Sequence, residues 1–544
     1  MNRTILATLL LAAVLYPGRA EESIKLKGAT KSTINVTVDS NPVKVIWYVD
    51  NYVTKPNRPE DQKINIYIPE NATKKSPIIF IVNNAGWQSD SYPTGTVRDG
   101  RDYDGTSDKI GVALKEGYVI VSYGARSRAN GMTEGRYLGH SPATMTDTKA
   151  AIRYLRYNRK ALPAGNTDRI VVTGTSGGGA LSTVIAASGN SEDFYPFLYE
   201  IGAAGITRNA DGSYSSEKGI GDDVFAAISY CPITDLGHGD AAYEWLYNDV
   251  RKALYMAGKM SYSYADEKTI MAASDELAAI YSKYVDTLGL KDENGEALNS
   301  SNLAAFIERL MRKEIELTVK ELGTEQMKSD VEQEIRRRGP GGPMGPSSQS
   351  AQGSTSHREN NGWITFGEDG SYSYDFNRHR YYTALYTTLK AAPSFSNVGL
   401  YHIGMNEDNL FGSESEEYCP FNPYSWNNDN VSNSVGKDDT GLDWNQYMQT
   451  PEGKALALEM KMTCAMDYLL EGKADSAPYW YVRHGMDDRD ASWAVEATLF
   501  ASIMNSSRVR GHNVGFAWLK PHSGDYDVPE AYEWLKSVLA AENR

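Results

Sequence analysis

Cysteine is scarce in this chain of 544 residues, which has only Cys231, Cys419 and Cys464. Three thiols allow at most one internal disulfide, so the fold must rest on its core and not on covalent cross-links. Hydrophobic residues make up 41% of the sequence. That content supports a large core, and the length exceeds that of one minimal domain.

The sequence also lacks a long basic stripe. Its 70 acidic residues outnumber its 55 basic residues, which gives a net charge of −15. We therefore expect no nucleic-acid partner, because phosphate backbones are bound by clustered Lys and Arg. Aromatic residues, in contrast, are plentiful: the 36 Tyr and 10 Trp suit a planar or sugar-like ligand.

No pattern of metal ligands or of cofactor-binding residues stands out, and we expect neither a metal nor a cofactor. The dipeptides Asp211-Gly212 and Asp369-Gly370 each precede Ser-Tyr-Ser and are typical of hairpin turns. The acidic ligands beside them are too few for a calcium loop.

Long apolar runs are missing as well. After residue 20, no uninterrupted run reaches the length of about 20 residues that spans a bilayer. Residues 1–20 have the pattern of a secretory signal: Arg3 gives a positive start, 5–16 is mainly apolar, and Gly18-Arg19-Ala20 offers small residues for cleavage. We expect cleavage after Ala20 and an exported protein, secreted or periplasmic, that has no membrane anchor.

Short apolar runs recur along the first part of the chain and return near its end. The predicted strands are 33–38, 64–68, 76–82, 118–123, 170–173, 224–230, 479–484 and 514–519. The first two alternate apolar and polar residues, as antiparallel strands with one wet face do, whereas 76–82 is continuous and predicts a strand covered on both faces. Helical patterns lie at 107–116, 143–159, 491–506 and from Pro529 onward. This alternation predicts an α/β fold with a mainly parallel sheet and helices on both faces.

The alternation stops between about 238 and 392, where the chain is helix-rich and more polar. We predict that 238–392 is a lid inserted into an α/β core, whose two parts are 21–237 and 393–544. Within the insertion, Gly, Pro and Ser dominate 339–356. That composition cannot bury a core and predicts a flexible loop.

The most informative motif is Gly174-Thr175-Ser176-Gly177-Gly178. It follows the predicted strand at 170–173 and opens a stretch of small residues that is typical of a helix. In this context Gly-x-Ser-x-Gly presents a nucleophilic serine on a sharp turn, and larger flanking residues would collide with the strand or the helix. The alternative is a Gly-rich strand-to-helix turn of another kind of α/β protein.

A serine nucleophile needs a base, which is His in this class of fold. Three histidines lie near the C-terminal end of the sequence, and only His522 follows the last predicted strand, where its loop can return to Ser176. His512 precedes that strand, and His484 ends the strand before it. We therefore predict that His522 is the base.

The acid that holds the base should follow the strand at 479–484, because the chain order in this class is Ser, acid, His. Asp487 and Asp488 both lie there. The Gly-x-x-Asp spacing from Gly485 favours Asp488, with Asp487 as the alternative.

The oxyanion donors are predicted to be backbone amides. The amide of Gly177 comes directly after the serine, and a second donor should come from the loop after an early strand. Asn83-Asn84-Ala85-Gly86-Trp87 follows the strand at 76–82, and its small residues let the amide of Ala85 or Gly86 approach a substrate. The alternative for this loop is an ordinary Asn/Gly turn.

Taken in order, several segments resemble the bacterial tannase family of α/β-hydrolases, which hydrolyse galloyl esters. They are Gly174 to Ala180, Tyr230 to Leu236 with Tyr243-Glu244-Trp245, Asn409-Leu410-Phe411-Gly412, Arg483 to Asp490, and His522 to Asp527. Each segment is a weak signal, and the ordered set is specific. The resemblance implies the α/β-hydrolase fold and a catalytic triad of Ser176, Asp488 and His522.

The resemblance also implies three residues that bind the galloyl ring: Lys390, Glu407 and Asp490. Their chemistry fits, because two carboxylates can accept hydrogen bonds from the ring hydroxyls and a lysine can donate to the hydroxyl oxygens. Without the resemblance, Lys390 would be interpreted as an exposed lysine at a helix end and Glu407 as a loop acid.

From these observations we expect a secreted serine esterase that cleaves galloyl esters of hydrolysable tannins and simple gallate esters through an acyl-enzyme and releases gallic acid. The alternative is a feruloyl esterase or a general carboxylesterase of the same fold. A pocket with two acids disfavours it, because a methoxy group cannot donate a hydrogen bond. A serine peptidase is disfavoured because no propeller repeat is present, and an inactive binding protein because Ser, Asp and His are intact. No sequence feature indicates the oligomeric state.

Overall fold

A computed structural model describes residues 24–88, 92–258, 265–337, 361–386, 389–400, 407–429 and 440–542 of the chain. The predicted signal segment at 1–20 and the Gly/Pro/Ser-rich tract at 339–356 lie outside these residues, so both stay predictions. Among the described residues, no helix is both long enough and apolar enough to cross a membrane.

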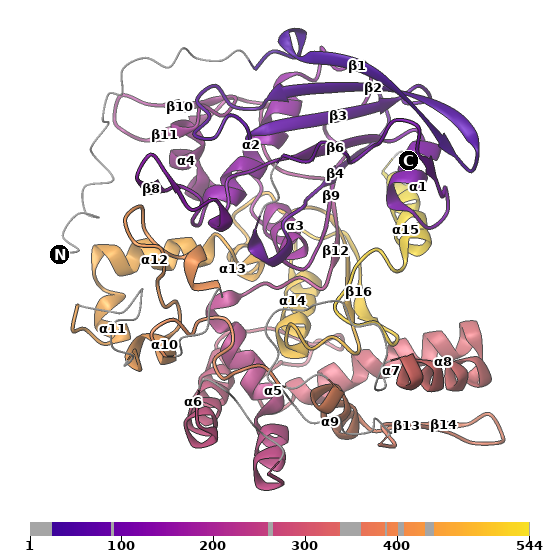
Figure 1. The fold of residues 1–544 in the computed structure, drawn as a ribbon, viewed down its shortest axis with the longest axis vertical. Helices are drawn as coiled ribbons and strands as arrows, with labels where there is room; N and C mark the ends of the chain where they lie inside the picture. Colours follow the sequence, from indigo (N-terminus) through magenta and orange to yellow (C-terminus); the bar gives the residue numbers. More distant parts are fainter. Residues whose placement is uncertain are drawn as a thin grey trace.

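A ten-stranded sheet forms the centre of the molecule (Figure 1). From one edge to the other its strands are β16 (Gly511–Ala517), β15 (Tyr479–Gly485), β12 (Ala226–Tyr230), β9 (Ile170–Thr175), β4 (Ile78–Ile81), β6 (Val119–Tyr123), β3 (Lys63–Pro69), β2 (Asn41–Asn51), β1 (Thr30–Val38) and β5 (Asp102–Tyr103). Neighbours from β16 to β6 are parallel, and β6, β3, β2 and β1 pair in antiparallel fashion. The predicted α/β class with a mainly parallel sheet is therefore confirmed.

The central strands are buried on both faces, which explains their continuous apolar sequences. Along β4, Ile78 and Phe80 belong to one hydrophobic core, whereas Ile79 and Ile81 belong to the other. This alternation follows from the two-residue period of a strand.

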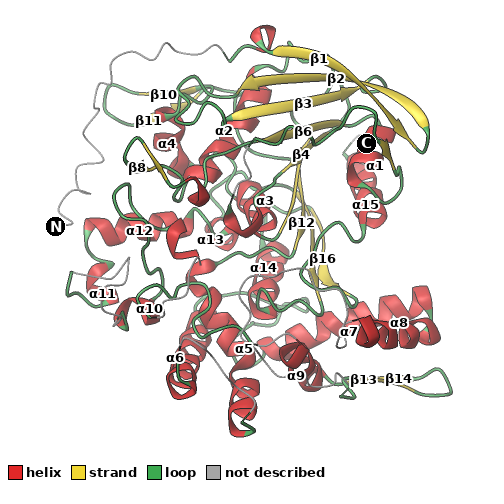
Figure 2. Ribbon diagram, in the orientation of Figure 1, coloured by secondary structure: helices red, strands yellow, loops and turns green. Residues whose placement is uncertain are grey.

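Helices cover both faces of the sheet (Figure 2). One core is completed by α2 (Ala143–Tyr157), α3 (Gly177–Ala187), α13 (Ala465–Glu471) and α14 (Trp493–Asn505), and the other by α1 (Lys109–Lys115) and α15 (Val528–Ala541). The helices α3 and α14 belong to the same core and begin directly after segments that carry predicted site residues, so both of these segments are anchored on one face of the sheet.

A large helical insertion separates β12 from β15, as predicted for the fold, and its helices continue past the predicted end at 392 to Lys461. It contains α5 (Leu236–Met256), α6 (Glu267–Val285), α7 (Leu303–Leu322), α8 (Thr324–Arg337), α9 (Phe376–Tyr386), α10 (Pro423–Asn427), α11 (Trp444–Tyr447) and α12 (Pro451–Lys461). Helices α5 to α9 lie together in the lower part of Figure 1, away from β1 to β3. The chain rejoins the large sheet only at Tyr479.

Smaller elements of the structure match the predicted ones or differ from them by a few residues. Hairpins surround both Asp-Gly turns, in β10 (Ile206–Arg208) with β11 (Tyr214–Ser216) and in β13 (Ile364–Phe366) with β14 (Tyr372–Tyr374). All three cysteines are free thiols. The last strand begins at Gly511 rather than 514, so His512 lies inside β16 opposite Trp480. The strand also ends early, because Leu519 has a positive φ of 52° that breaks the extended backbone.

A buried charge cluster ties α2 to the segment before β12. Lys149 Nζ and Arg153 Nη1 lie 2.8 Å and 2.9 Å from the two carboxylate oxygens of Asp222, and all three side chains are essentially inaccessible to solvent. Such a cluster is stable only while each charge keeps its partner.

Asp222→Asn should therefore lower the free energy of unfolding by about 3–5 kcal/mol, because two buried cations lose the carboxylate that neutralises them. Urea denaturation followed by circular dichroism measures this change. Asp39→Asn is the matched control, because Asp39 pairs with Lys115 at the surface with 41% of its side chain exposed. Its midpoint should stay close to that of the wild type, and equal midpoints for the two variants would contradict the role given to Asp222.

Candidate active site

Ser176 occupies the sharp turn between β9 and α3. Its backbone has φ 60° and ψ −125°, a conformation that residues other than glycine rarely adopt. Backbone hydrogen bonds stabilise this conformation: the Ser176 amide donates to the carbonyl of Tyr230 at 2.9 Å, and the amide of Ala180 donates to the Ser176 carbonyl at 2.9 Å. The turn therefore presents the serine hydroxyl at the carboxyl edge of the sheet, as the motif predicted.

The residue after the serine must be glycine because another backbone segment lies against it. A Cβ atom at Gly177 would stand 2.2 Å from the amide nitrogen of Trp87 and 2.5 Å from the carbonyl oxygen of Asn84. Both contacts come from the 3₁₀ helix η3 (Ala85–Trp87) and its first flanking residue. The elbow and the predicted oxyanion loop are thus in direct backbone contact.

Ser176, His522 and Asp488 form a continuous chain of hydrogen bonds. Nε2 of His522 lies 2.8 Å from Oγ of Ser176, and Nδ1 of His522 lies 2.8 Å from Oδ2 of Asp488. His522 comes from the loop after β16, and Asp488 from the loop after β15. The structure therefore brings together the three residues that the sequence predicted, in the arrangement that lets a serine hydroxyl lose its proton to an imidazole.

The charges around His522 and Asp488 favour an imidazolium on the first next to a carboxylate on the second. Burial by itself would raise the pKa of Asp488, but the imidazoles of His522 and His484 hold it well below its usual range. Burial likewise acts to lower the pKa of His522, and the Asp488 carboxylate outweighs it, so the net shift is upward. The Asp490 amide also donates to Oδ1 of Asp488 at 2.7 Å, which fixes the carboxylate plane.

Asp487 has a different environment from its neighbour. Its Oδ1 lies 3.1 Å from Nε2 of His379, whose other ring nitrogen lies 3.0 Å from the hydroxyl of Tyr374. The His379 ring stacks on Trp363 with a centroid distance of 4.2 Å. The two adjacent acids therefore have different partners: Asp488 contacts His522, whereas Asp487 contacts His379 of the helical insertion.

His484 is fully buried in β15, at the end of the strand where the sequence placed it. Its Nδ1 lies 3.6 Å from Asp488 Oδ2 and 3.5 Å from Oε1 of Glu496. Burial lowers the pKa of His484 to about 4, so the ring is neutral at physiological pH.

The predicted oxyanion donors lie beside the serine. In the described part of the chain, the Trp87 amide donates to Asn84 and the Gln88 amide donates to Ala85, whereas the amides of Ala85 and Gly86 have no protein acceptor. The Gly177 amide begins α3, where the first amides have no partner within the helix. The Gly86 nitrogen would be only 3.1 Å from a Cβ at Gly177, so these donors lie close to one another.

The three residues implied for ring binding lie close enough to act on one another. Lys390 Nζ donates to the backbone carbonyl of Asp490 at 2.8 Å and lies 3.6 Å from its carboxylate. Burial raises the pKa of Glu407, and the cations of Arg128 and Lys390 oppose that shift. The Asp490 and Lys390 charges also act on His522. The two carboxylates and the ammonium group are partly exposed, with side-chain exposures between 15% and 34%.

Helix α5 holds the segment that carries Lys390. The Lys390 amide donates to the Tyr243 hydroxyl at 3.4 Å, and Arg251 Nη2 donates to the Lys390 carbonyl at 2.9 Å. Arg251 is itself paired with Glu244 of the same helix. Asp240, one turn earlier, accepts the amides of 394–396 at 2.6–3.0 Å. Helix α5 of the insertion thus fixes the backbone of Lys390 and of residues 394–396.

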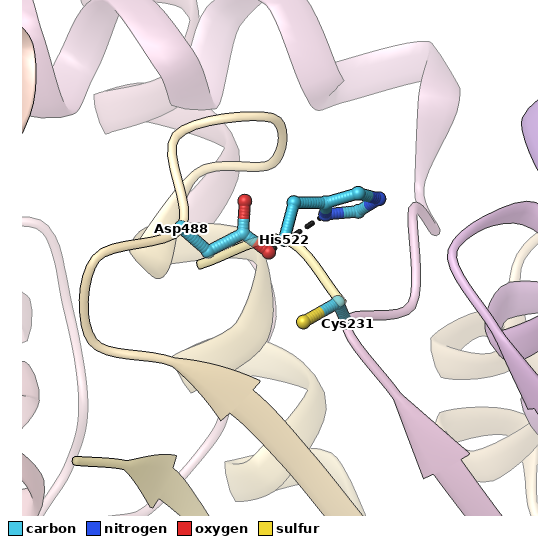
Figure 3. A group of neighbouring side chains, drawn as sticks. All are labelled: Cys231, Asp488 and His522. Carbon is cyan, nitrogen blue, oxygen red and sulfur yellow. Dashed lines mark hydrogen bonds and ion pairs between the residues drawn. The ribbon is translucent and has the colours of Figure 1, made fainter. Parts of the chain in front are cut away.

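Two residues of the site are not among the predicted site residues, although one of them, Cys231, lies in the segment Tyr230 to Leu236. Cys231, at the end of β12, places its thiol against the Asp488 carboxylate, and Figure 3 shows Cys231, His522 and Asp488 converging there from three separate segments. Burial raises the pKa of the Cys231 thiol well above its usual range, so the sulfur stays protonated and can donate to the carboxylate. Arg128, after β6, lies against both Gly86 and Glu407.

Cys231, Asp488 and His522 offer possible metal-ligand atoms that lie within 4.8 Å of one another. The 2.8 Å contact between Nδ1 of His522 and Asp488 is a hydrogen-bond distance, so an ion there would have to break it. We therefore assign these groups to the hydrogen-bonded chain and not to a metal.

Comparison with known proteins defines the class first. Residues 64–274, which include the elbow, match the BD-FAE family, a family of the α/β-hydrolase type. The sheet order, the insertion after β12 and this match together show that the chain has an α/β-hydrolase fold. No curated protein sequence matches the chain.

Bacterial tannases are among the solved structures that share the fold over nearly the whole chain. The tannase of Fusobacterium nucleatum is 25% identical with a TM-score of 0.70, over 95% of this chain and 100% of that one. The tannin acyl hydrolase of Lactobacillus plantarum is 24% identical with a TM-score of 0.66, over 95% and 98% of the two chains. A tannin acyl hydrolase solved with ethyl gallate gives the same identity, TM-score and coverage. The resemblance to bacterial tannases is therefore confirmed at the level of the fold.

The contacts of His522 lead to a prediction about its pKa, which can be measured without an activity assay. In Asp488→Asn, the pKa of His522 should fall below 6.5, because burial then acts without the carboxylate that opposes it. An NMR titration of the imidazole signals, assigned with His522→Gln, measures the value. Asp487→Asn is the control and should leave the pKa of His522 unchanged, because Asp487 contacts His379. A pKa that stays above 6.5 in Asp488→Asn would show that another group sets it.

Proposed function

We propose that this protein is a serine esterase that hydrolyses galloyl esters, both simple gallates and hydrolysable tannins, and releases gallic acid. The observation that carries the proposal is the hydrogen-bonded chain of Ser176, His522 and Asp488 next to a partly exposed group of two carboxylates and one ammonium. The structural likeness to bacterial tannases, one of them solved with ethyl gallate, supports the same substrate class.

In the proposed acylation step, Oγ of Ser176 attacks the ester carbonyl carbon while Nε2 of His522 takes its proton. The charge that forms on the carbonyl oxygen is stabilised by the amides of Gly177 and of the Ala85-Gly86 loop. Asp488 holds the imidazole in the tautomer that accepts at Nε2 and stabilises the imidazolium. The C–O bond to the alcohol then breaks, and His522 returns the proton to the leaving oxygen.

Deacylation repeats these steps with water as the nucleophile. His522 takes a proton from water, the hydroxide oxygen attacks the galloyl-enzyme carbonyl, and the bond to Oγ breaks as Ser176 regains a proton. Gallic acid then leaves. The ester, one water molecule and the residues named here balance the atoms and charges of both steps.

Recognition of the acyl group is assigned to Lys390, Glu407 and Asp490. A galloyl ring carries three hydroxyls, so carboxylates can accept from them and an ammonium can donate to their oxygens. A ring with a methoxy group in place of a hydroxyl leaves a buried acceptor unpaired, which costs about 1–3 kcal/mol. This difference separates the proposal from its alternative, a feruloyl esterase or general carboxylesterase with the same reactive groups.

We further propose that the enzyme acts outside the cytoplasm, secreted or periplasmic, after cleavage at Ala20. The support is the charge and apolar pattern of residues 1–20. A mature form that begins at Glu21 in the periplasm or the medium is the expected finding.

Ser176→Ala should leave the fold intact and lower kcat on methyl gallate by a factor on the order of 10⁶, because no other group can form the acyl-enzyme. Release of gallate, followed by chromatography, measures the rate, and an unchanged thermal midpoint shows that the fold is kept. Mass spectrometry of the quenched wild type should show a galloyl adduct on the peptide that contains Ser176. Turnover near the wild-type level in folded Ser176→Ala would disprove this mechanism.

Glu407→Ala and Asp490→Ala should each lower kcat/KM on methyl gallate by roughly 5- to 150-fold, the cost of an unpaired polar contact. Hydrolysis of methyl benzoate, which lacks the hydroxyls, should fall much less. Asp490→Ala keeps the backbone amide that donates to Asp488, so the hydrogen-bonded chain survives this substitution.

Glu414→Ala is the matched control, because Glu414 pairs with Arg136 at the surface, seven residues beyond Glu407. It should leave the ratio of the two rates unchanged. If the wild type hydrolysed methyl ferulate or methyl benzoate as efficiently as methyl gallate, the ring-binding assignment would fail and the general esterase would replace it.

A further inference from the structure

Arg128 is a buried cation in the short helix η4 (Arg128–Asn130), which follows β6. Only 4% of its side chain is exposed. A capping box holds the turn that carries it: the Ala129 amide donates to Ser127 Oγ at 3.2 Å, and the Ser127 amide donates to Asn130 Oδ1 at 2.7 Å. The guanidinium therefore extends from a fixed backbone.

One edge of the guanidinium holds the oxyanion loop. Nε and Nη2 of Arg128 both donate to the carbonyl oxygen of Gly86, at 3.0 Å and 2.6 Å. Gly86 has a φ of 60°, a conformation open to other backbone arrangements because glycine has no Cβ. Two charge-assisted donors on one oxygen restrict that freedom, and so fix the peptide next to the predicted oxyanion amides.

The other edge of the guanidinium holds the ring-binding side. Nη1 of Arg128 donates to Oδ1 of Asn409, and Nη2 lies 3.5 Å from Oε1 of Glu407. Both partners belong to the short helix η6 (Glu407–Leu410). The same helix is tied to the segment after Lys390, because Asp408 accepts the amides of Asn397 and Val398 at 2.9 Å.

A single rigid group therefore spans the two ends of the proposed substrate site. A benzoyl ester is planar and conjugated, so the separation between its ring hydroxyls and its ester carbonyl is set by covalent geometry. Such a substrate cannot adjust a torsion to compensate if the two ends of the site are out of register. A misplacement of 1 Å at the reacting atoms can cost about 10²-fold in rate.

We infer that Arg128 is a positioning residue that sets the separation between Glu407 and the amides of the Ala85-Gly86 loop, and thereby selects rigid hydroxylated benzoyl esters. This inference rests on the proposed function and extends it to a residue that contacts neither the serine nor the base. The guanidinium fork is the essential feature, because a lysine would keep the charge but could not hold Gly86 and η6 at once.

The test compares Arg128→Lys with the wild type on methyl gallate and on p-nitrophenyl acetate, whose acyl group has no ring. We expect kcat on methyl gallate to fall by up to about 10²-fold, because the ester carbonyl of the substrate is no longer in register with the oxyanion amides. The change in KM should be small, because the lysine keeps the positive charge that faces Glu407. On the acetate the fall should be at least tenfold smaller. In Glu407→Ala, the further loss caused by Arg128→Lys on methyl gallate should shrink to its value on the acetate.

Arg126→Lys is the matched control. Arg126 lies two residues away, is also buried, and pairs with Asp147 at 2.9 Å without contacting Gly86 or η6. Both variants should lower the thermal midpoint, and only Arg128→Lys should change the ratio of the two substrates. Equal fold losses on both substrates, or full additivity with Glu407→Ala, would overturn the inference and leave Arg128 as a scaffold residue.

The wild type separates this inference from the proposed function. If the wild type shows no preference for methyl gallate over methyl benzoate, the proposed function fails, and the ring-side part of the inference is overturned with it. If the preference is present and Arg128→Lys retains it, the proposed function stands and the inference alone is wrong.

Discussion

The site depends on one buried carboxylate, that of Asp488. An ionised carboxylate without partners would be very costly in the interior, so the segments that supply its partners must meet at this point. The His522 imidazole comes from the loop after β16, the Cys231 thiol from the end of β12, and the Asp490 amide from the same loop as Asp488. The backbone of Asp490 also joins this carboxylate to Lys390, because its amide donates to Asp488 and its carbonyl accepts from Lys390 Nζ. Loss of this carboxylate would therefore affect both sides of the site.

The sheet and the insertion contribute different kinds of groups. The carboxyl ends of β9, β15 and β16 carry the serine, the acid and the base, which need fixed relative positions. The insertion supplies Lys390 and Glu407, and α5 fixes the first of these through its backbone and not through its side chain. The reactive groups thus lie on the rigid core, whereas the polar groups proposed to recognise the ring lie on loops that differ most easily between proteins of this fold.

Much of the fold could be predicted because its signals are local. The buried strands are visible as continuous apolar runs, and the elbow as a glycine-flanked serine between a strand and a helix. The last strand begins three residues before the predicted start, because Gly511, His512 and Asn513 are not apolar, and it ends two residues before the apolar run does, because Leu519 has a positive φ. Arg128 and Cys231 could not be predicted as site residues, because the sequence around them does not indicate which distant groups their side chains contact.

The sequence by itself determined the α/β order, the insertion, the elbow and the short set of residues that could act with Ser176. These depend on periodicity and on turns within a few residues. Only the tertiary structure decided which of two adjacent acids meets His522, and that Arg128 joins Gly86 to η6. Ser176 and His522 are 346 residues apart in the chain, and Arg128 and Glu407 are 279 apart. Contacts of this range follow from how the sheet and insertion close around the site, because side-chain direction at a loop is set by packing and not by local propensity.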